Sequence, residues 1–180
     1  MKKLIFLLVA AVLLAGCARW RPKPKPAPPI KPYETPTVYN FKKSDKNDAK
    51  IFQTMGLDYF KRGNFAQAQT NFKKAIKLDP TLYNCWYHLG LLNTETQEGY
   101  GYFKKTAELK PEFHNHYFWM AYYHCLQYED KEASAMFKKY IELAANEPGE
   151  EARLKTAKEV LQELSLGKDV QALNTIRKPR

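Results

Sequence analysis

The sequence has little cysteine and no apolar segment of membrane-spanning length. Three cysteines in 180 residues are too few for a small fold stapled by disulfides. The main apolar run, Leu4 to Ala15, would cover about 18 Å as a helix, well short of the ~30 Å core of a bilayer. A permanent transmembrane helix is therefore not expected from this run. A chain of this length is also too short for a large multidomain enzyme.

Common sequence motifs for metal binding, phosphate binding and catalysis are absent as well. The sequence contains no CxxC, HExxH, P-loop or G-x-S-x-G pattern. His114 and His116 lie two residues apart at the predicted start of a helix, so their side chains do not share a face. Cys85 and Cys125 fall out of step on neighbouring predicted helices, so we expect two free thiols. We predict no enzyme activity, no metal site and no cofactor.

Basic residues outnumber acidic residues in the chain. Lys and Arg total 29 against 19 Asp and Glu, a formal net charge of +10. Such an excess favours anionic partners: phospholipid headgroups, polyanionic envelope polymers or nucleic acid. The compartment decides which of these is relevant.

The N-terminus indicates the compartment. Lys2 and Lys3 precede the apolar run, which ends in Leu14-Ala15-Gly16-Cys17. This arrangement resembles the lipobox of bacterial lipoproteins. The resemblance implies that residues 1–16 are a signal peptide that is removed. It also implies that Cys17 carries a covalent lipid, a diacylglycerol with a further acyl chain such as palmitate. Two or more acyl chains anchor a protein stably.

The same resemblance implies a place in the cell envelope. Ala18 follows the cysteine, where an Asp often marks retention in the inner membrane, so we expect the outer membrane facing the periplasm if the organism is diderm. Nucleic acid is then not expected as a partner.

Residues 17–48 are predicted to form a disordered tether. Seven prolines lie between residues 19 and 36, which favours extended polyproline II over helix or sheet. Four basic residues near the anchor are candidates for contact with an anionic surface: Arg19, Arg21, Lys23 and Lys25.

A repeating pattern follows the tether and predicts an all-α fold. The first copy places small and apolar residues on one face of each of two helices, with a break at Gly63-Asn64. Its pattern residues are Phe52, Met55, Gly56, Tyr59, Ala68, Phe72, Ala75 and Pro80. These spacings are similar to those of the tetratricopeptide repeat (TPR), a helical hairpin that stacks into a solenoid.

Three repeats are predicted, at 49–82, 83–113 and 114–147. They are followed by a capping helix at 148–167 and a basic tail at 168–180. The second repeat lacks three residues around its turn, so we expect its hairpin to be shorter or tilted. Gly99 and Gly101 are expected to weaken its second helix, because glycine costs roughly 1 kcal/mol against alanine there.

The TPR resemblance implies that the first helix of each repeat lines a concave groove. The candidate partner-binding residues of this groove are Leu57, Phe60, Tyr87, Leu91, Phe118 and Tyr122. Aromatic rings in such a groove are typical anchors for a partner helix or extended peptide. The alternative, also open at this point, is that some rings pack against the tether, the cap or each other.

The expected function is that of a membrane-anchored TPR scaffold or adaptor. It would bind a protein partner and help to assemble or stabilise an envelope complex, a pilotin-like role being one version. The alternative is a structural spacer whose basic tether contacts cell-wall polymer or anionic lipid.

Overall fold

The computed structural model describes residues 43–167, 170 and 172. The signal peptide, Cys17, the four basic residues beside it and most of the tail lie outside the described residues. Residues 43–167 contain seven helices and no strand, in agreement with the predicted all-α class. The helices are α2 (Lys43–Lys61), α3 (Phe65–Leu78), α4 (Tyr83–Leu91), α5 (Gln97–Leu109), α6 (Asn115–Leu126), α7 (Asp130–Ala144) and α8 (Glu151–Ser165).

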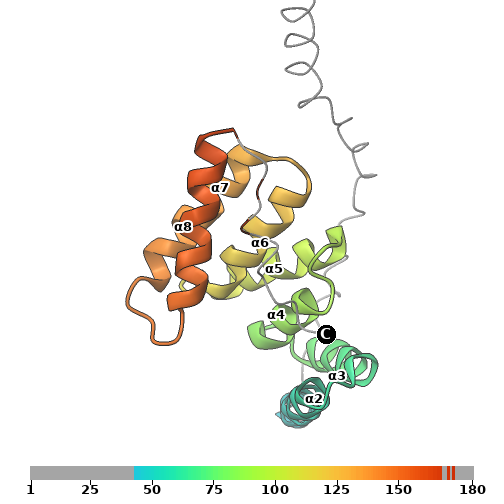
Figure 1. Cartoon of the computed structure of the whole chain (residues 1–180). Coiled ribbons are helices and arrows are strands. Elements are labelled where there is room, and N and C mark those ends of the chain that lie inside the picture. The colour runs from blue at the N-terminus through green and yellow to red at the C-terminus, as the bar shows by residue number, and fades with distance from the viewer. Residues whose placement is uncertain (1–42, 168–169, 171, 173–180) are drawn as a thin grey trace, which may run out of the picture.

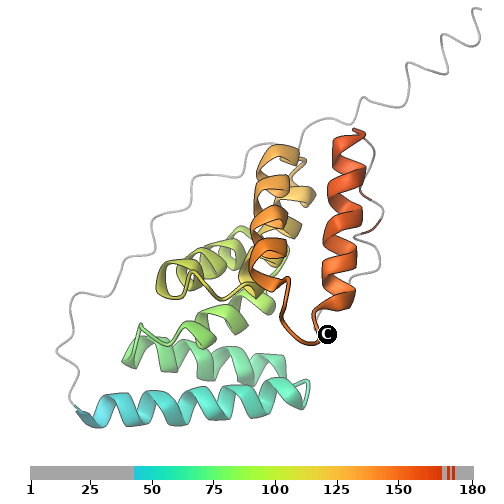
Figure 2. The same cartoon turned by 90° about the vertical axis from the view of Figure 1, so that its left-hand side faces the viewer.

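The helices form a series of antiparallel hairpins. α2 packs with α3, α4 with α5, and α6 with α7, and each hairpin contacts the next along the chain. Figure 2 shows α2 and α3 at one end of this solenoid and α8 at the other. The last helix packs on α7 and covers the end of the series.

α2 begins earlier than the sequence pattern predicts. Residues 43–48, assigned above to the tether, are helical. Pro36 is the last proline before this helix, so no residue between it and Ala49 blocks the helical backbone. Ala49 is fully buried, and Asp45 lies in the first turn, where a carboxylate is favourable beside the positive end of the helix dipole.

Two glycines permit the close crossing within a hairpin. A Cβ placed on Gly56 would lie 2.6 Å from the ring of Phe72, and one on Gly90 would lie 2.5 Å from the ring of Phe103. Neither contact leaves room for a methyl group, so only glycine permits these close crossings. Gly63 ends the first helix in the left-handed region at φ +75°, and Asn64 then caps α3 by accepting from the Gln67 amide.

The second hairpin is short, as its missing residues predict. α4 has nine residues, against 19 in α2. It is tied to the first hairpin by the Trp86 indole Nε1–H, which donates to the Pro80 carbonyl at 2.8 Å.

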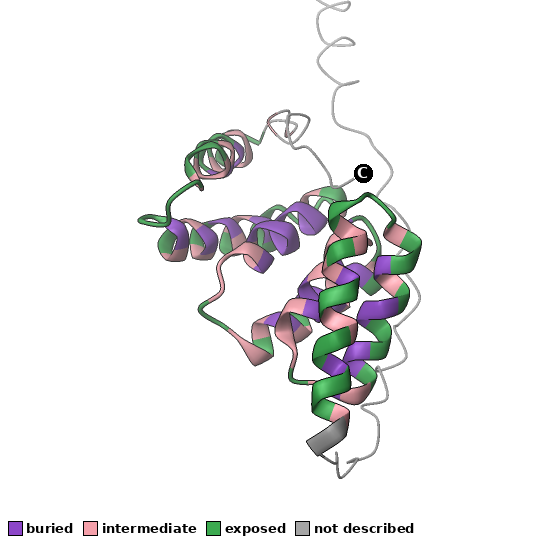
Figure 3. Ribbon diagram, turned by 90° about the horizontal axis from the view of Figure 1, so that it is seen from below, coloured by how far each residue is buried: buried purple, intermediate pink, exposed green. Residues whose placement is uncertain are grey.

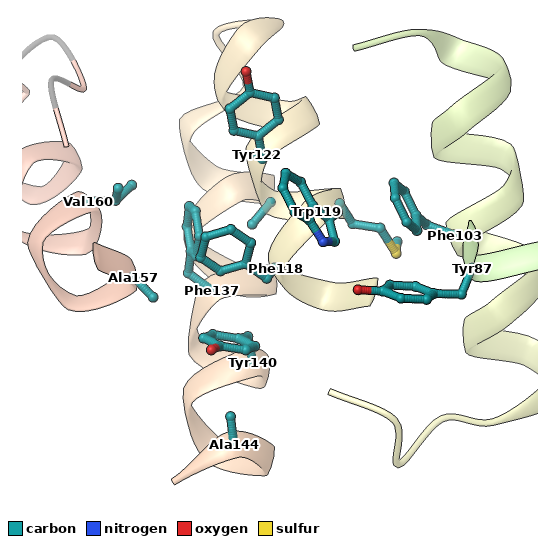
Figure 4. Close-up of a cluster of buried hydrophobic side chains, with 12 residues drawn as sticks. Tyr87, Phe103, Phe118, Trp119, Tyr122, Phe137, Tyr140, Ala144, Ala157 and Val160 are labelled. Atoms are coloured by element: carbon teal, nitrogen blue, oxygen red, sulfur yellow. The ribbon is translucent and has the colours of Figure 1, made fainter. Parts of the chain in front are cut away.

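Buried side chains form two clusters. The N-terminal cluster comprises Ala68, Phe72, Ala75, Ile76, Cys85, Trp86, Leu89 and Tyr102. The C-terminal cluster comprises Tyr87, Phe103, Phe118, Trp119, Met120, Ala121, Tyr122, Phe137, Tyr140, Ala144, Ala157 and Val160. Figure 4 shows the second of these between α4, α6, α7 and α8.

Candidate functional site

The expected groove residues of α2 remain partly accessible. Leu57 and Phe60 are half-buried and pack against the N-terminal cluster. The Phe60 ring meets the edge of His88 with centroids 5.1 Å apart, which joins α2 to α4. Both side chains keep solvent-facing area for contact with another molecule.

The two groove residues of α4 differ in their exposure to solvent. Tyr87 is 8% exposed and stacks edge-on against Phe113 at 5.0 Å, while Leu91 is half-buried beside the C-terminal cluster. Burial raises the pKa of the Tyr87 phenol, so it stays protonated at neutral pH. Leu91 is therefore the more accessible of the two.

The groove residues of α6 lie in the core. Phe118 is 1% exposed and packs edge-on against Phe137 at 5.7 Å and Tyr140 at 5.2 Å. Tyr122 is 4% exposed, and its hydroxyl donates to Glu95 Oε1 at 3.2 Å. Figure 4 shows both rings among side chains of the cluster. For these residues the structure corrects the expectation of an open groove: Phe118 packs against α7, and Tyr122 packs edge-on against Trp119 of its own helix at 5.9 Å.

The cap region adds a polar cluster that sequence reasoning missed. Glu150 accepts from the Tyr140 hydroxyl at 2.7 Å and from Arg153 at 3.0 Å, and Arg153 also donates to Asn115. His114 Nε2 lies 3.6 Å from the same carboxylate. The cluster joins the starts of α6 and α8 to α7. Its contacts are long-range, so the only local sign was the spacing of Glu150 and Arg153.

A second polar chain links the middle and last hairpins. His124 contacts Glu129 Oε2 through Nδ1 at 2.6 Å and the Tyr100 hydroxyl through Nε2 at 3.1 Å. Desolvation, and then the Glu129 charge, raises the pKa of Tyr100. A protonated phenol is a poor nucleophile, so this carboxylate–imidazole–phenol chain acts as a bridge between α5, α6 and the start of α7.

The thiols and histidines of the described region offer little reactive chemistry. Cys85 and Cys125 are free, and burial raises the pKa of each thiol to about 12, which keeps it in the unreactive protonated form. Within residues 43–167, 170 and 172, no group of three or more His, Cys, Asp or Glu side chains is arranged to hold a metal ion.

The arrangement of hairpins, close-crossing glycines and a terminal packing helix defines a TPR-type helical repeat domain. The TPR repeat family matches residues 56–96, from the second half of α2 through α3 and α4 to the turn before α5. A prokaryotic membrane lipoprotein lipid attachment site matches residues 1–18. The chain therefore carries a lipoprotein lipid attachment site ahead of a TPR-type domain, which fits a membrane-anchored TPR protein. None of its described helices has the length and apolar character needed to cross a membrane.

Solved structures with the same fold are TPR domains. The first TPR of Spaghetti (RPAP3), bound to the HSP90 peptide SRMEEVD, aligns with a TM-score of 0.57 and 16% identity, covering 68% of this chain and 94% of that one. The Arabidopsis OM64 TPR domain aligns with a TM-score of 0.58 and 16% identity, covering 66% and 98%. At this identity the likeness concerns the fold alone. No curated protein matches the chain significantly.

Proposed function

We propose that the protein is an adaptor that holds a protein partner at the envelope membrane, with no enzymatic activity, metal or cofactor of its own. The observation that carries the proposal is the joining of a lipid attachment site to a TPR domain in one chain. The anchor would confine the domain to a surface, and the inner face of the first helices would bind a segment of the partner. Assembly or stabilisation of an envelope complex is the task we assign to it.

The binding surface that we propose lies over α2 and α4. Leu57, Phe60 and Leu91 come from the first helices of the first two repeats and keep partial exposure. Tyr87, Phe118 and Tyr122 lie beneath or beside this surface and support it through packing. Apolar side chains that are partly exposed on rigid helices suit a partner helix or extended peptide, because little conformational entropy is lost when they bind.

We assign the protein to the outer membrane facing the periplasm in a diderm cell, on the basis of Ala18 after the lipidated cysteine. The polymer of the cell wall and nucleic acid are not part of the proposed function. The competing role is that of a spacer, in which the basic tether meets an anionic surface and the inner face binds nothing.

Site-specific photo-crosslinking in living cells tests the proposal. A photoreactive amino acid is placed at Phe60 or Leu91, and at exposed Lys138 on α7 as the control. We expect one discrete adduct from the two inner positions that is absent from the control, and mass spectrometry then identifies the partner. The absence of any adduct at Phe60 and Leu91 would contradict the adaptor function and favour the spacer.

A further inference from the structure

Charge is divided between the two ends of the solenoid. Residues 43–80, the first hairpin, contain eight Lys and Arg against four Asp and no Glu, a net charge of +4. Residues 83–167 contain nine Lys and Arg against 13 Asp and Glu, a net charge of −4. Because the hairpins are stacked in chain order, the basic hairpin lies at one end and the acidic remainder extends away from it (Figure 2).

The basic hairpin also exposes apolar side chains. Ile51 and Met55 are 56% and 41% exposed and lie one turn apart on α2. With Lys50 and Thr54 they line a shallow pocket. Figure 3 shows the row of exposed residues along this helix. Within the described residues, these are two of only five large apolar side chains that are exposed.

Two lysines lie near this apolar strip. Lys50 lines the same shallow pocket, and Lys74 of α3 places its Nζ 5.3 Å from the centre of the ring of Phe52, the residue after Ile51. Both lysines are exposed.

Asp48 and Asp58 are exposed at helical spacing from Ile51 and Met55, so carboxylates lie on the same face of α2 as the apolar side chains and Lys50. The hairpin keeps a net charge of +4, and apolar side chains beside lysines are the pattern by which amphipathic helices lie on anionic membranes, with the apolar atoms at the acyl boundary and the ammonium groups among the headgroups.

The position of the strip in the chain favours lipid over other occupants. α2 is the first described helix and follows the lipid attachment site in the chain, so the anchor raises the local concentration of α2 at the bilayer. A second copy of the chain fits less well. Two apolar side chains supply only a small part of the ~1,200 Å² that a stable dimer interface buries, and the lysines of the two copies would repel each other.

We propose that the exposed face of α2, formed by Lys50, Ile51 and Met55 together with Lys74, binds an anionic phospholipid surface. The domain then rests on the membrane through its basic end, and its acidic end points away. This contact rests on the lipid anchor and is independent of partner binding at the inner face. It involves residues of the folded domain, in addition to the basic residues of the tether.

Vesicle co-sedimentation of the mature chain with Cys17→Ser tests the proposal, because the anchor then contributes nothing. The vesicles are phosphatidylcholine with 30 mol% phosphatidylglycerol, and pure phosphatidylcholine for comparison. Each lysine near an anionic surface contributes roughly fivefold in affinity. We therefore expect Lys50→Glu with Lys74→Glu to weaken binding at least 25-fold on the anionic vesicles, in a salt-dependent way.

The matched control is Lys131→Glu with Lys138→Glu, which removes the same charge from exposed positions on α7. It should leave binding within twofold of the parent. An equal loss in both pairs would overturn the proposal in favour of a simple net-charge effect, and no loss in either would assign the binding to the tether alone. Unchanged melting temperatures of all variants would establish that folding is intact.

The contribution of the apolar side chains of Ile51 and Met55 to membrane binding is tested separately. Ile51→Ser with Met55→Ser should weaken binding to the anionic vesicles several-fold, whereas Leu126→Ser with Leu166→Ser, at two other exposed apolar positions, should not. Sedimentation velocity of the parent should give a monomer. A dimer that is lost on Ile51→Ser would overturn the proposal and assign the strip to a second copy of the chain.

Discussion

At the residue scale, Gly99 has a structural role that its low helix propensity conceals. A Cβ at this position would lie 1.9 Å from the backbone oxygen of Asn93, because the shortened turn of the second hairpin crosses directly over the start of α5. The same turn is fixed by Thr96, whose hydroxyl accepts from the Gly99 amide at 3.0 Å and donates to the Asn93 carbonyl. Glycine is therefore required here, where the repeat pattern has alanine.

Alanine substitutions at the two glycines of α5 should have opposite effects. Gly99→Ala should lower the free energy of unfolding by about 2 kcal/mol, since the turn must move to admit the methyl group. Gly101→Ala should raise it by about 0.5–1 kcal/mol, because no atom lies within 4 Å of the added Cβ and alanine is the better helix former. Urea denaturation of both variants measures this, and two changes of the same sign would contradict it.

His116 makes stability depend on pH. It is fully buried, neither ring nitrogen has a hydrogen-bond partner, and burial lowers its pKa to about 4. The unfolded chain binds a proton near pH 6.5, whereas the folded chain does not until about pH 4, so stability is full above 6.5 and falls as the pH drops toward 4. Burial lowers the pKa of His88 as well, so this residue also reduces the stability of the fold as the pH falls.

Replacing His116 should remove most of this dependence. His116→Phe keeps an aromatic ring and has no proton to bind, so its stability at pH 5 should exceed that of the parent by about 1–2 kcal/mol more than it does at pH 7.5. Thermal melts at the two pH values check the difference. A parent and variant with parallel pH profiles would mean that His116 is charged or solvated in the folded chain.

At the element scale, the attachment of α8 depends on a few polar contacts as well as on Ala157 and Val160. Tyr140 is fully buried, and its hydroxyl donates to Glu150 at the start of the helix. Glu150→Ala would leave both that hydroxyl and Arg153 without this acceptor, at a cost of about 1–3 kcal/mol. Hydrogen exchange should become faster in α8 and stay unchanged in α2, which lies at the other end of the solenoid.

The control for this variant is Glu159→Ala. Glu159 is exposed and lies 3.9 Å from Lys155, a surface pair of small energetic value. Loss of this pair should change the rate of hydrogen exchange in α8 very little. If hydrogen exchange in α8 became faster by the same factor in both variants, α8 would be held by its helix propensity and not by the Glu150 cluster.

The helices differ in how well their sequences specify their contacts. In the first hairpin, the sequence predicts the contacts well. Gly56 permits a close crossing against Phe72, and Gly63 permits a left-handed turn. α6 is aromatic on all sides, and its periodicity therefore does not separate an inner face from a core face. The TPR pattern alone places Phe118 in the groove, and the periodicity of α6 offers no signal against that placement. The Glu150 cluster was missed because no local pattern reports a contact between Asn115 and Arg153.

At the scale of the whole molecule, the lipid attachment site and the basic hairpin follow one another in the sequence. The attachment site is at residues 1–18 and the net charge of +4 is in the first hairpin, whereas the residues of net charge −4 follow it. Such a division orients a protein on an anionic surface more than it strengthens binding. The anchor supplies the affinity, and the hairpin determines which end of the solenoid faces the membrane.

Cys17→Ser separates these two contributions in cells. The thiol is the atom that receives the lipid, so the variant should incorporate no labelled fatty acid and keep the length of the precursor. Fractionation should find the parent in the membrane at any salt concentration. High salt should release more of the variant than of the parent, because charge contacts then replace the lipid and the uncleaved apolar run is too short to span the bilayer. Fatty-acid labelling that persists in Cys17→Ser would contradict the anchor, and with it the orientation that places α2 against the membrane.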